Sequence, residues 1–219
     1  MKSNTFVNNE YYHIYCRGVE KRQIFMDDTY YRRFLLGLKV FNTESLSWIS
    51  EQKDTDERFP RQDNLVNILC YCLMPNHYHL LLKQKIDGGI TKFMRKLNTG
   101  FTMYFNLKNE RTGRLFESRF KSVHVEDNEY LMHLWRYIHL NPLDLINKNW
   151  REGKFKNSSF IKFLTDYKWS SYKYFNTNIR NDIINKDIFE ELYDKNLDNS
   201  LVEWSQRDTE TLGHLTLES

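Results

Sequence analysis

Two histidines separated by one residue, His77 and His79, are the side chains in this sequence best suited to hold a metal ion. They follow the turn-forming pair Pro75-Asn76 and begin an apolar run that is typical of a β-strand. Side chains at positions i and i+2 of a strand point to the same face, so the two imidazoles should lie side by side. Such a pair could bind one ion. The alternative is that the two rings only form hydrogen bonds within the fold.

A second pair of polar side chains, Tyr137 and Asn141, is spaced for one face of a helix. If this face meets the histidine strand, Asn141 can give an oxygen ligand to the same ion, with Tyr137 one helical turn away. Taken singly, Tyr137 is expected to pack in the core, since the chain has 14 tyrosines. Asn141 taken singly is expected to end the helix. The two pairs together predict a site built from a strand and a distant helix.

The elements that must position these residues follow from hydrophobic periodicity and turn signals. We expect strands at residues 11–17, 65–74, 77–84 and 117–126, and helices at 27–41, 90–107 and 127–140. Pro75-Asn76 joins the second and third strands as an antiparallel hairpin. This order predicts an α+β, ferredoxin-like split βαβ fold with a four-stranded antiparallel sheet. Two helices should cover one face of the sheet, with the helix of Tyr137 near the other.

The chain divides by composition into two parts. Residues 1–150 contain all the predicted strands and should form the functional domain, whereas residues 151–219 form a C-terminal extension. Within the extension, residues 197–219 are polar enough to be a mobile tail. Residues 51–63 are charged and aperiodic, which is typical of a surface loop. Four aromatic residues of the extension could pack back onto the domain: Trp169, Tyr172, Tyr174 and Phe175.

Composition indicates a globular protein of the cytoplasm. Hydrophobic residues make up 40% of the chain and charged residues 28%, so it is neither membrane-spanning nor wholly disordered. No run approaches about 18 apolar residues, and the N-terminus lacks the apolar segment of a signal peptide. The three cysteines are an odd number, and Cys70 and Cys72 lie within an apolar run. We therefore expect buried thiols in a reducing compartment.

Positive charge is concentrated next to the histidine strand. Residues 92–121 contain eight Lys or Arg residues against two Glu, although the whole chain has a net charge of only +3. Residues 151–219 contain 10 basic and 12 acidic residues. A phosphate-binding surface would need such a concentration. The alternative is a solvated helix face followed by a polar loop.

A structural zinc site is a competing interpretation of the histidines. If the hairpin pairs Met74 with His77, Cys72 falls opposite His79 on the same face. Together with Cys70 these side chains would supply the ligands that structural Zn²⁺ prefers. A zinc site would leave Tyr137 and Asn141 without a role. The alternative to a zinc site is that Cys72 lies beside the histidines without binding a metal ion.

Four motifs occur in order along the chain: His13-x-x-x-Arg17-Gly18, Met74-Pro75-Asn76-His77-x-His79-Leu80-Leu81, Gly113-Arg114-Leu115-Phe116-x-x-Arg119-Phe120-Lys121-Ser122 and Tyr137-Ile138-His139-x-Asn141-Pro142. With these motifs the sequence resembles the single-tyrosine HUH transposases of the insertion-sequence type, and most closely the REP-associated tyrosine transposases. The resemblance runs from about Tyr11 to Leu143, and the later Trp169-Ser170-Ser171-Tyr172 also looks familial.

The resemblance implies metal-assisted cleavage and rejoining of single-stranded DNA at hairpin-associated sites, through a 5′-phosphotyrosine. His77 and His79 match the pair that holds Mg²⁺ or Mn²⁺, and Tyr137 matches the nucleophile. Asn141 matches the position of a third ligand, which is Gln in some relatives. Two imidazoles suit Mn²⁺ better than Mg²⁺, which prefers oxygen ligands. The candidate DNA contacts are Arg17, Arg95, Arg114, Arg119 and Lys121.

The resemblance also implies a protein that has no membrane partner and joins the nucleoid when bound to DNA. Both a monomer and a homodimer fit, because some relatives share helices between two subunits. Three other functions fit part of the sequence. A nucleotide hydrolase of the histidine-triad kind would need a histidine where Leu81 stands. A non-catalytic nucleic-acid-binding module would stack bases on Tyr11 and Tyr15 and would need no metal. A domesticated relative would bind hairpins but cleave poorly.

Overall fold

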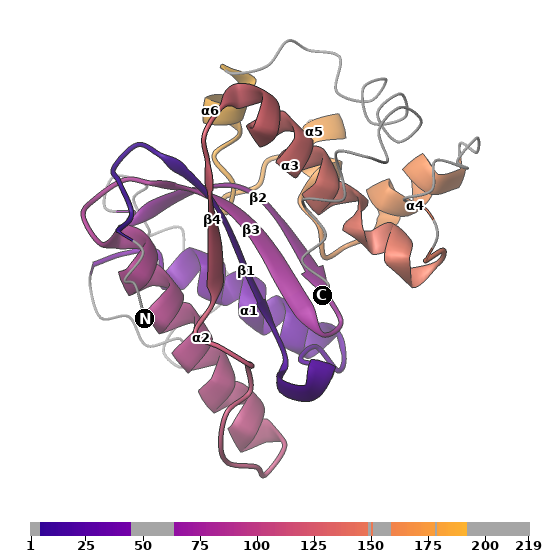
Figure 1. Cartoon of the computed structure of the whole chain (residues 1–219). Coiled ribbons are helices and arrows are strands. Elements are labelled where there is room, and N and C mark those ends of the chain that lie inside the picture. Colours follow the sequence, from indigo (N-terminus) through magenta and orange to yellow (C-terminus); the bar gives the residue numbers. More distant parts are fainter. Residues whose placement is uncertain (1–4, 45–63, 149, 151–158, 178, 192–219) are drawn as a thin grey trace.

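The computed structural model describes residues 5–44, 64–148, 150, 159–177 and 179–191 (Figure 1). The predicted loop at 51–63 and the predicted tail at 197–219 lie outside the described residues. In chain order the elements are β1 (Tyr11–Arg17), η1 (Val19–Lys21), α1 (Asp28–Val40), β2 (Val66–Met74), β3 (His77–Gln84), α2 (Gly89–Lys108), β4 (Lys121–Val125), α3 (Asn128–Leu140), η4 (Asn141–Leu145), α4 (Ser159–Asp166), α5 (Tyr172–Asn176) and α6 (Lys186–Glu190).

The four strands form one antiparallel sheet in the order β2-β3-β1-β4. This is the order of the ferredoxin-like split βαβ fold, so the predicted fold class is confirmed. In the hairpin, Met74 lies opposite His77 and Cys72 opposite His79, which is the register that the zinc interpretation assumed. Strand β4 is shorter than expected and begins at Lys121. Just before it, the carbonyl of Arg119 accepts a hydrogen bond from Asn98 of α2 instead of joining the sheet.

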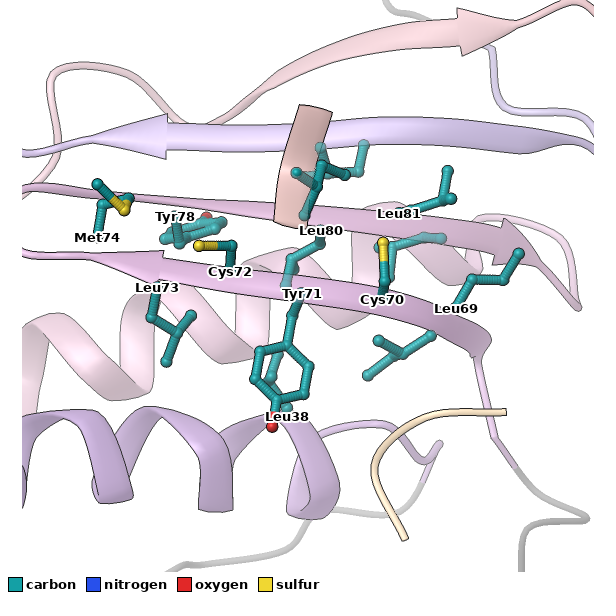
Figure 2. Packing of buried hydrophobic residues seen from close by; sticks show 14 of the residues in the cluster. Leu38, Leu69, Cys70, Tyr71, Cys72, Leu73, Met74, Tyr78, Leu80 and Leu81 are labelled. Carbon is teal, nitrogen blue, oxygen red and sulfur yellow. The ribbon is translucent and has the colours of Figure 1, made fainter. Parts of the chain in front are cut away.

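Helices α1 and α2 cover one face of the sheet, and alternation along β3 directs apolar side chains to them. The Tyr78 ring packs on Phe34 of α1 at a centroid distance of 4.8 Å. Its hydroxyl donates a hydrogen bond to Asn98 of α2 at 2.7 Å. Figure 2 shows Tyr71 and Leu73 extending from β2 on the side of α1. The histidines that flank Tyr78 therefore point to the opposite face.

Helix α3 lies on that opposite face (Figure 1). The Asp127 side chain caps its first turn by accepting the backbone N–H of Tyr130 at 2.7 Å. Asp27 caps α1 in the same way through Thr29, also at 2.7 Å. The two predicted helix starts at residue 127 and residue 27 are therefore explained by one local signal, an acidic side chain placed before an apolar stripe.

Residues beyond 150 continue the fold along the outer edge of β2. Trp169 and Ser171 exchange backbone hydrogen bonds with Leu73 and Tyr71, at 2.9 and 3.0 Å. The Trp169 ring also stacks on Tyr31 of α1, with centroids 4.4 Å apart. This segment protects an edge strand that would otherwise expose unpaired backbone groups. A domain boundary at residue 150 stays a prediction.

None of the helices in the described part of the chain is long and apolar enough to cross a membrane.

The turn between β2 and β3 is fixed by the segment that follows β1. The backbone N–H of Gly18 donates to the carbonyl of Asn76 at 2.8 Å, and those of Ile24 and Phe25 donate to the carbonyl of Pro75 at 2.8 and 3.0 Å. A Cβ atom on Gly18 would lie 2.5 Å from the carbonyl oxygen of Arg22. Only glycine therefore allows this close approach, which holds the turn before His77 in place.

We expect Gly18→Ala to lower the free energy of unfolding by about 1–3 kcal/mol, because the added methyl group overlaps backbone and forces the loop away from the turn. Denaturant titration would measure the loss. The matched control is Gln23→Ala, an exposed position of the same loop, for which a change within about 0.5 kcal/mol is expected. Equal stability of the Gly18 variant and the wild type would contradict the close packing described here.

Candidate active site

The two histidines of β3 lie side by side on the face of the sheet that α1 and α2 do not cover. The ring centroids of His77 and His79 are 4.9 Å apart, and the ring planes are perpendicular. Both side chains are buried, with 8% and 3% of their surface exposed. The i, i+2 spacing of a strand therefore produces the paired arrangement that the sequence predicts.

The Nδ1 atom of each of these rings is engaged in a hydrogen bond. Nδ1–H of His77 donates to the side-chain oxygen of Asn76 at 2.6 Å. The amide nitrogen of Asn76 donates to the carbonyl of Lys21 at 3.2 Å, which fixes the direction of that amide. Nδ1 of His79 lies 2.9 Å from Nε2 of His13 on β1. Because Nδ1 of His77 is engaged as a donor, Nε2 is the nitrogen through which that imidazole can coordinate a metal ion, and the same holds for His79 in the tautomer that carries its proton on Nδ1.

Helix α3 places Tyr137 against the histidines. Its ring stands edge-on to His79 at a centroid distance of 5.7 Å and to His13 at 6.4 Å. The side chain is 1% exposed. Edge-to-face aromatic contacts of this kind contribute about 0.5–1.5 kcal/mol beyond burial. Residues 13, 79 and 137 are distant in sequence, and the fold of a single chain brings them together.

Asn141 lies at the end of α3 and is also buried. Its side-chain nitrogen donates to the backbone carbonyl of Tyr137 at 2.8 Å, so the amide closes the last turn of the helix. It is not among the residues that line the pocket between Tyr137 and the histidines. Its predicted role as a third metal ligand stays a prediction.

A small pocket opens between the sheet and α3. Its volume of about 20 Å³ suffices for one water-sized species. Lys121 lies 3.7 Å from Glu117 and 5.8 Å from the centroid of the Tyr15 ring, so a cation and an acid share the pocket with an aromatic ring. Burial, followed by the negative charge of Glu117, raises the pKa of Tyr15. The lining residues are Tyr15, Cys16, Arg17, His77, His79, Glu117, Lys121 and Tyr137.

The structure separates the five predicted DNA contacts into two groups. Arg17 and Lys121 line the pocket. Arg114 and Arg119 are exposed on the connection from α2 to β4, and Arg95 is exposed on α2, which covers the other face of the sheet. Arg17 and Lys121 are therefore placed at the pocket, whereas Arg95 lies on the helix layer of the opposite face.

Sequence reasoning did not assign His13, Tyr15, Asn76 or Glu117 to the site. His13, Tyr15 and Arg17 alternate along β1 and therefore share one face, which was the available signal for the first two. Asn76 belongs to the quoted motif, but its contact with Lys21 depends on the segment after β1. The place of Glu117 at the pocket depends on the fold. Burial lowers the pKa of His13 to about 3, so this ring is neutral at physiological pH.

The structure gives the zinc interpretation no support. Cys72 lies opposite His79 as predicted, and burial raises the pKa of both Cys70 and Cys72. Within the described residues, no group of three or more His, Cys, Asp or Glu side chains is placed to hold a metal ion. The two cysteines are buried thiols among apolar neighbours (Figure 2).

A further buried histidine, His139, anchors α3 to the segment that covers β2. Its Nε2 lies 2.8 Å from the hydroxyl oxygen of Ser171. The same oxygen accepts the backbone N–H of Tyr71 at 2.9 Å. Burial lowers the pKa of His139 to about 3. The neutral imidazole therefore helps to hold α3, and with it Tyr137, at a fixed distance from the sheet.

Stability should depend on pH through His139. The unfolded chain takes up a proton near the usual pKa of 6.5, whereas the folded chain does so only near 3. Stability present above pH 6.5 should thus be lost as pH falls toward 3, by about 1.4 kcal/mol per pH unit for this one group. In denaturant titrations at several pH values, His139→Gln should remove this part of the slope. The control replaces exposed His124 by Gln, and equal slopes for His139→Gln and wild type would refute the assignment.

Comparisons with known proteins identify the family and support the fold. The family model described as "Transposase IS200 like" matches residues 6–141, which is more than half of the chain. None of the curated proteins matches significantly. A solved structure of a REP-associated tyrosine transposase bound to a REP hairpin is similar in fold, with a TM-score of 0.51 and 14% sequence identity over 89% of this chain and 88% of that one. The chain belongs to the family of IS200-like transposases.

Proposed function

We propose that this protein cleaves and rejoins single-stranded DNA through a covalent link to Tyr137. The observation that carries the proposal is the edge-on contact of Tyr137 with His79, at the wall of a pocket that Arg17 and Lys121 also line. A tyrosine that packs on an imidazole at a pocket lined by two cationic side chains is suited to attack a phosphodiester. Membership of a transposase family supports the same reaction class.

In the proposed reaction, the hydroxyl oxygen of Tyr137 attacks the phosphorus atom. One P–O bond forms to the tyrosine, and the bond from phosphorus to the 3′-oxygen breaks. The 3′-oxygen takes up a proton to become a free hydroxyl, and the phenol proton is released. The same hydroxyl, or one from another strand, can then attack the 5′-phosphotyrosine and restore a phosphodiester. The number of phosphodiester-type bonds is conserved, so no nucleotide cofactor is needed.

His77 and His79 would hold a divalent cation, Mg²⁺ or Mn²⁺, through their Nε2 atoms, with Asn141 as the proposed further ligand. The donor set fits, because both rings are oriented by hydrogen bonds at Nδ1 and both line the pocket. The bound ion would supply polarisation of a phosphoryl oxygen. An unperturbed phenol has a pKa of about 10, so attack also depends on how closely the fold positions Tyr137.

The basic residues would bind the phosphate backbone. Arg17 and Lys121 can contact the phosphate that reacts, and Arg114 and Arg119 can contact flanking phosphates. The REP-associated transposase with the same fold was solved with a REP hairpin, so we propose hairpin-associated single-stranded DNA as the substrate. The protein would act in the cytoplasm, on the nucleoid. Because Tyr137 and the imidazoles meet within one chain, no helix exchange between subunits is required.

Incubation of the protein and Mn²⁺ with a library of hairpin-bearing single strands should give an adduct that survives denaturing electrophoresis. Tyr137→Phe should abolish the adduct, because phenylalanine has no nucleophile, while the affinity for DNA stays within about threefold of wild type. The matched control is Tyr104→Phe on α2, at the opposite face of the sheet, which should leave the adduct unchanged.

An undiminished adduct with Tyr137→Phe would show that another group is the nucleophile. Binding of hairpins by the wild type without any adduct, with or without Mn²⁺, would instead favour a non-catalytic nucleic-acid-binding protein. Tyr15 could serve that function, since its half-buried ring at the pocket could stack on a base. Loss of the adduct in both His77→Ala and His79→Ala would support a site that needs the histidine pair.

Single-strand affinity should fall when Lys121 or Arg119 is replaced by Ala. Each lost phosphate contact should reduce the slope of log affinity against log salt concentration by about 0.7, because fewer counterions are released. Fluorescence anisotropy at several salt concentrations would measure both quantities. Lys92→Ala is the control, since Lys92 lies on α2 and pairs with Glu44 at 3.0 Å. If Lys121→Ala and Arg119→Ala leave the slope as unchanged as the control does, this would count against the proposed phosphate contacts.

A further inference from the structure

His13 on β1 contacts both His79 of β3 and Tyr137 of α3. On the paired strands Tyr15 lies opposite His79 and His13 lies opposite Leu81, so the two histidines are diagonal neighbours on one face. The His13 ring is 1% exposed. It stacks on His79 with centroids 5.1 Å apart and an interplanar angle of 19°. The edge contact with Tyr137 is made by the same ring.

The hydrogen bond between the two imidazoles allows two arrangements of one proton. Nε2 of His13 lies 2.9 Å from Nδ1 of His79, so one of these nitrogens must donate and the other accept. If His13 donates, the proton of a neutral His79 sits on Nε2, and that nitrogen cannot coordinate a metal ion. If His79 donates from Nδ1, its Nε2 carries the lone pair that a metal ion needs.

We propose that His13 is a positioning residue that accepts the Nδ1–H of His79 and thereby fixes the tautomer in which His79 can bind a metal ion. This inference rests on the metal site of the proposed function. His77 is arranged in the same way, because its Nδ1–H donates to an Asn76 oxygen whose direction is fixed by Lys21. Each of the two proposed histidine ligands thus has its own acceptor for the proton on Nδ1.

The chemistry of the acceptor also suits a phosphate substrate. Metal-bound histidines are often oriented by a carboxylate, which would place a negative charge beside the ion. A buried neutral imidazole orients His79 without that charge. The positive charge of the ion would therefore remain available to attract a phosphodiester. His13 also packs on Tyr137, so the same ring helps to set the position of the nucleophile relative to the ligand.

Two substitutions separate the hydrogen bond from the volume of the ring. His13→Gln keeps an acceptor, because the side-chain oxygen of Gln can reach the position of the imidazole Nε2. His13→Leu fills a similar volume without an acceptor. Binding of Mn²⁺ to the full-length protein without DNA can be measured by electron paramagnetic resonance. We expect His13→Leu to weaken Mn²⁺ binding by about 10- to 100-fold and His13→Gln by no more than about threefold.

The tautomer itself can be read from ¹⁵N NMR of the histidine side chains. In the wild type without metal, His79 should carry its proton on Nδ1. In His13→Leu it should shift toward the Nε2–H form, while His77 should not change. Denaturant titration of each variant would show that the fold is intact. If His13→Leu does not fold, the spectra of the wild type and of His13→Gln still show whether His79 carries its proton on Nδ1.

The metal site and the role of His13 would be overturned by different results. If the wild type does not bind Mn²⁺, or if His77→Ala does not weaken binding, the proposed metal site fails. If the wild type binds Mn²⁺ and His13→Leu binds it equally well, the positioning role of His13 fails and the metal site stands. An Nε2–H tautomer of His79 in the wild type, or equal losses in His13→Leu and His13→Gln, would also contradict the role of the acceptor.

Discussion

The packing of α3 across the histidine face of the sheet determines where every other group of the site can lie. Tyr137 can stand beside His79 only if the helix keeps a fixed height and rotation over β1 and β3. Buried aromatic contacts set that height, and the hydrogen bond between His139 and Ser171 ties the helix to the segment along β2. Residues far from the pocket therefore hold Tyr137 and the histidines together, as a preorganised site would require.

The alternation of side chains along β3 assigns a separate task to each face of the sheet. Tyr78 points toward α1 and α2 and belongs to the main apolar core, whereas His77 and His79 point toward α3. The polar face is costly to bury unless its groups satisfy one another. Here the imidazoles are matched by Asn76 and His13, so the groups that would bind a metal ion are oriented within the folded chain itself.

Local signals in the sequence predicted much of this arrangement. Pro75-Asn76 and the two following histidines were enough to predict the hairpin and the shared face, and Asp127 predicted the start of α3. The partners of His79 and His139 could not be predicted, because they depend on strand order and on a segment about 30 residues further along the chain. The placement of Arg95 also required the fold, since net charge along the sequence does not tell which face of a sheet a helix covers.

We propose that the Tyr137 oxygen, and not another group at the pocket, attacks the phosphodiester. Mass spectrometry of a protease digest of the protein after reaction with single-stranded DNA can identify the attacking residue. We expect the DNA remnant to be attached to the peptide that contains Tyr137. Attachment to the peptide that contains Tyr15, the other tyrosine that lines the pocket, would show that Tyr137 is not the nucleophile.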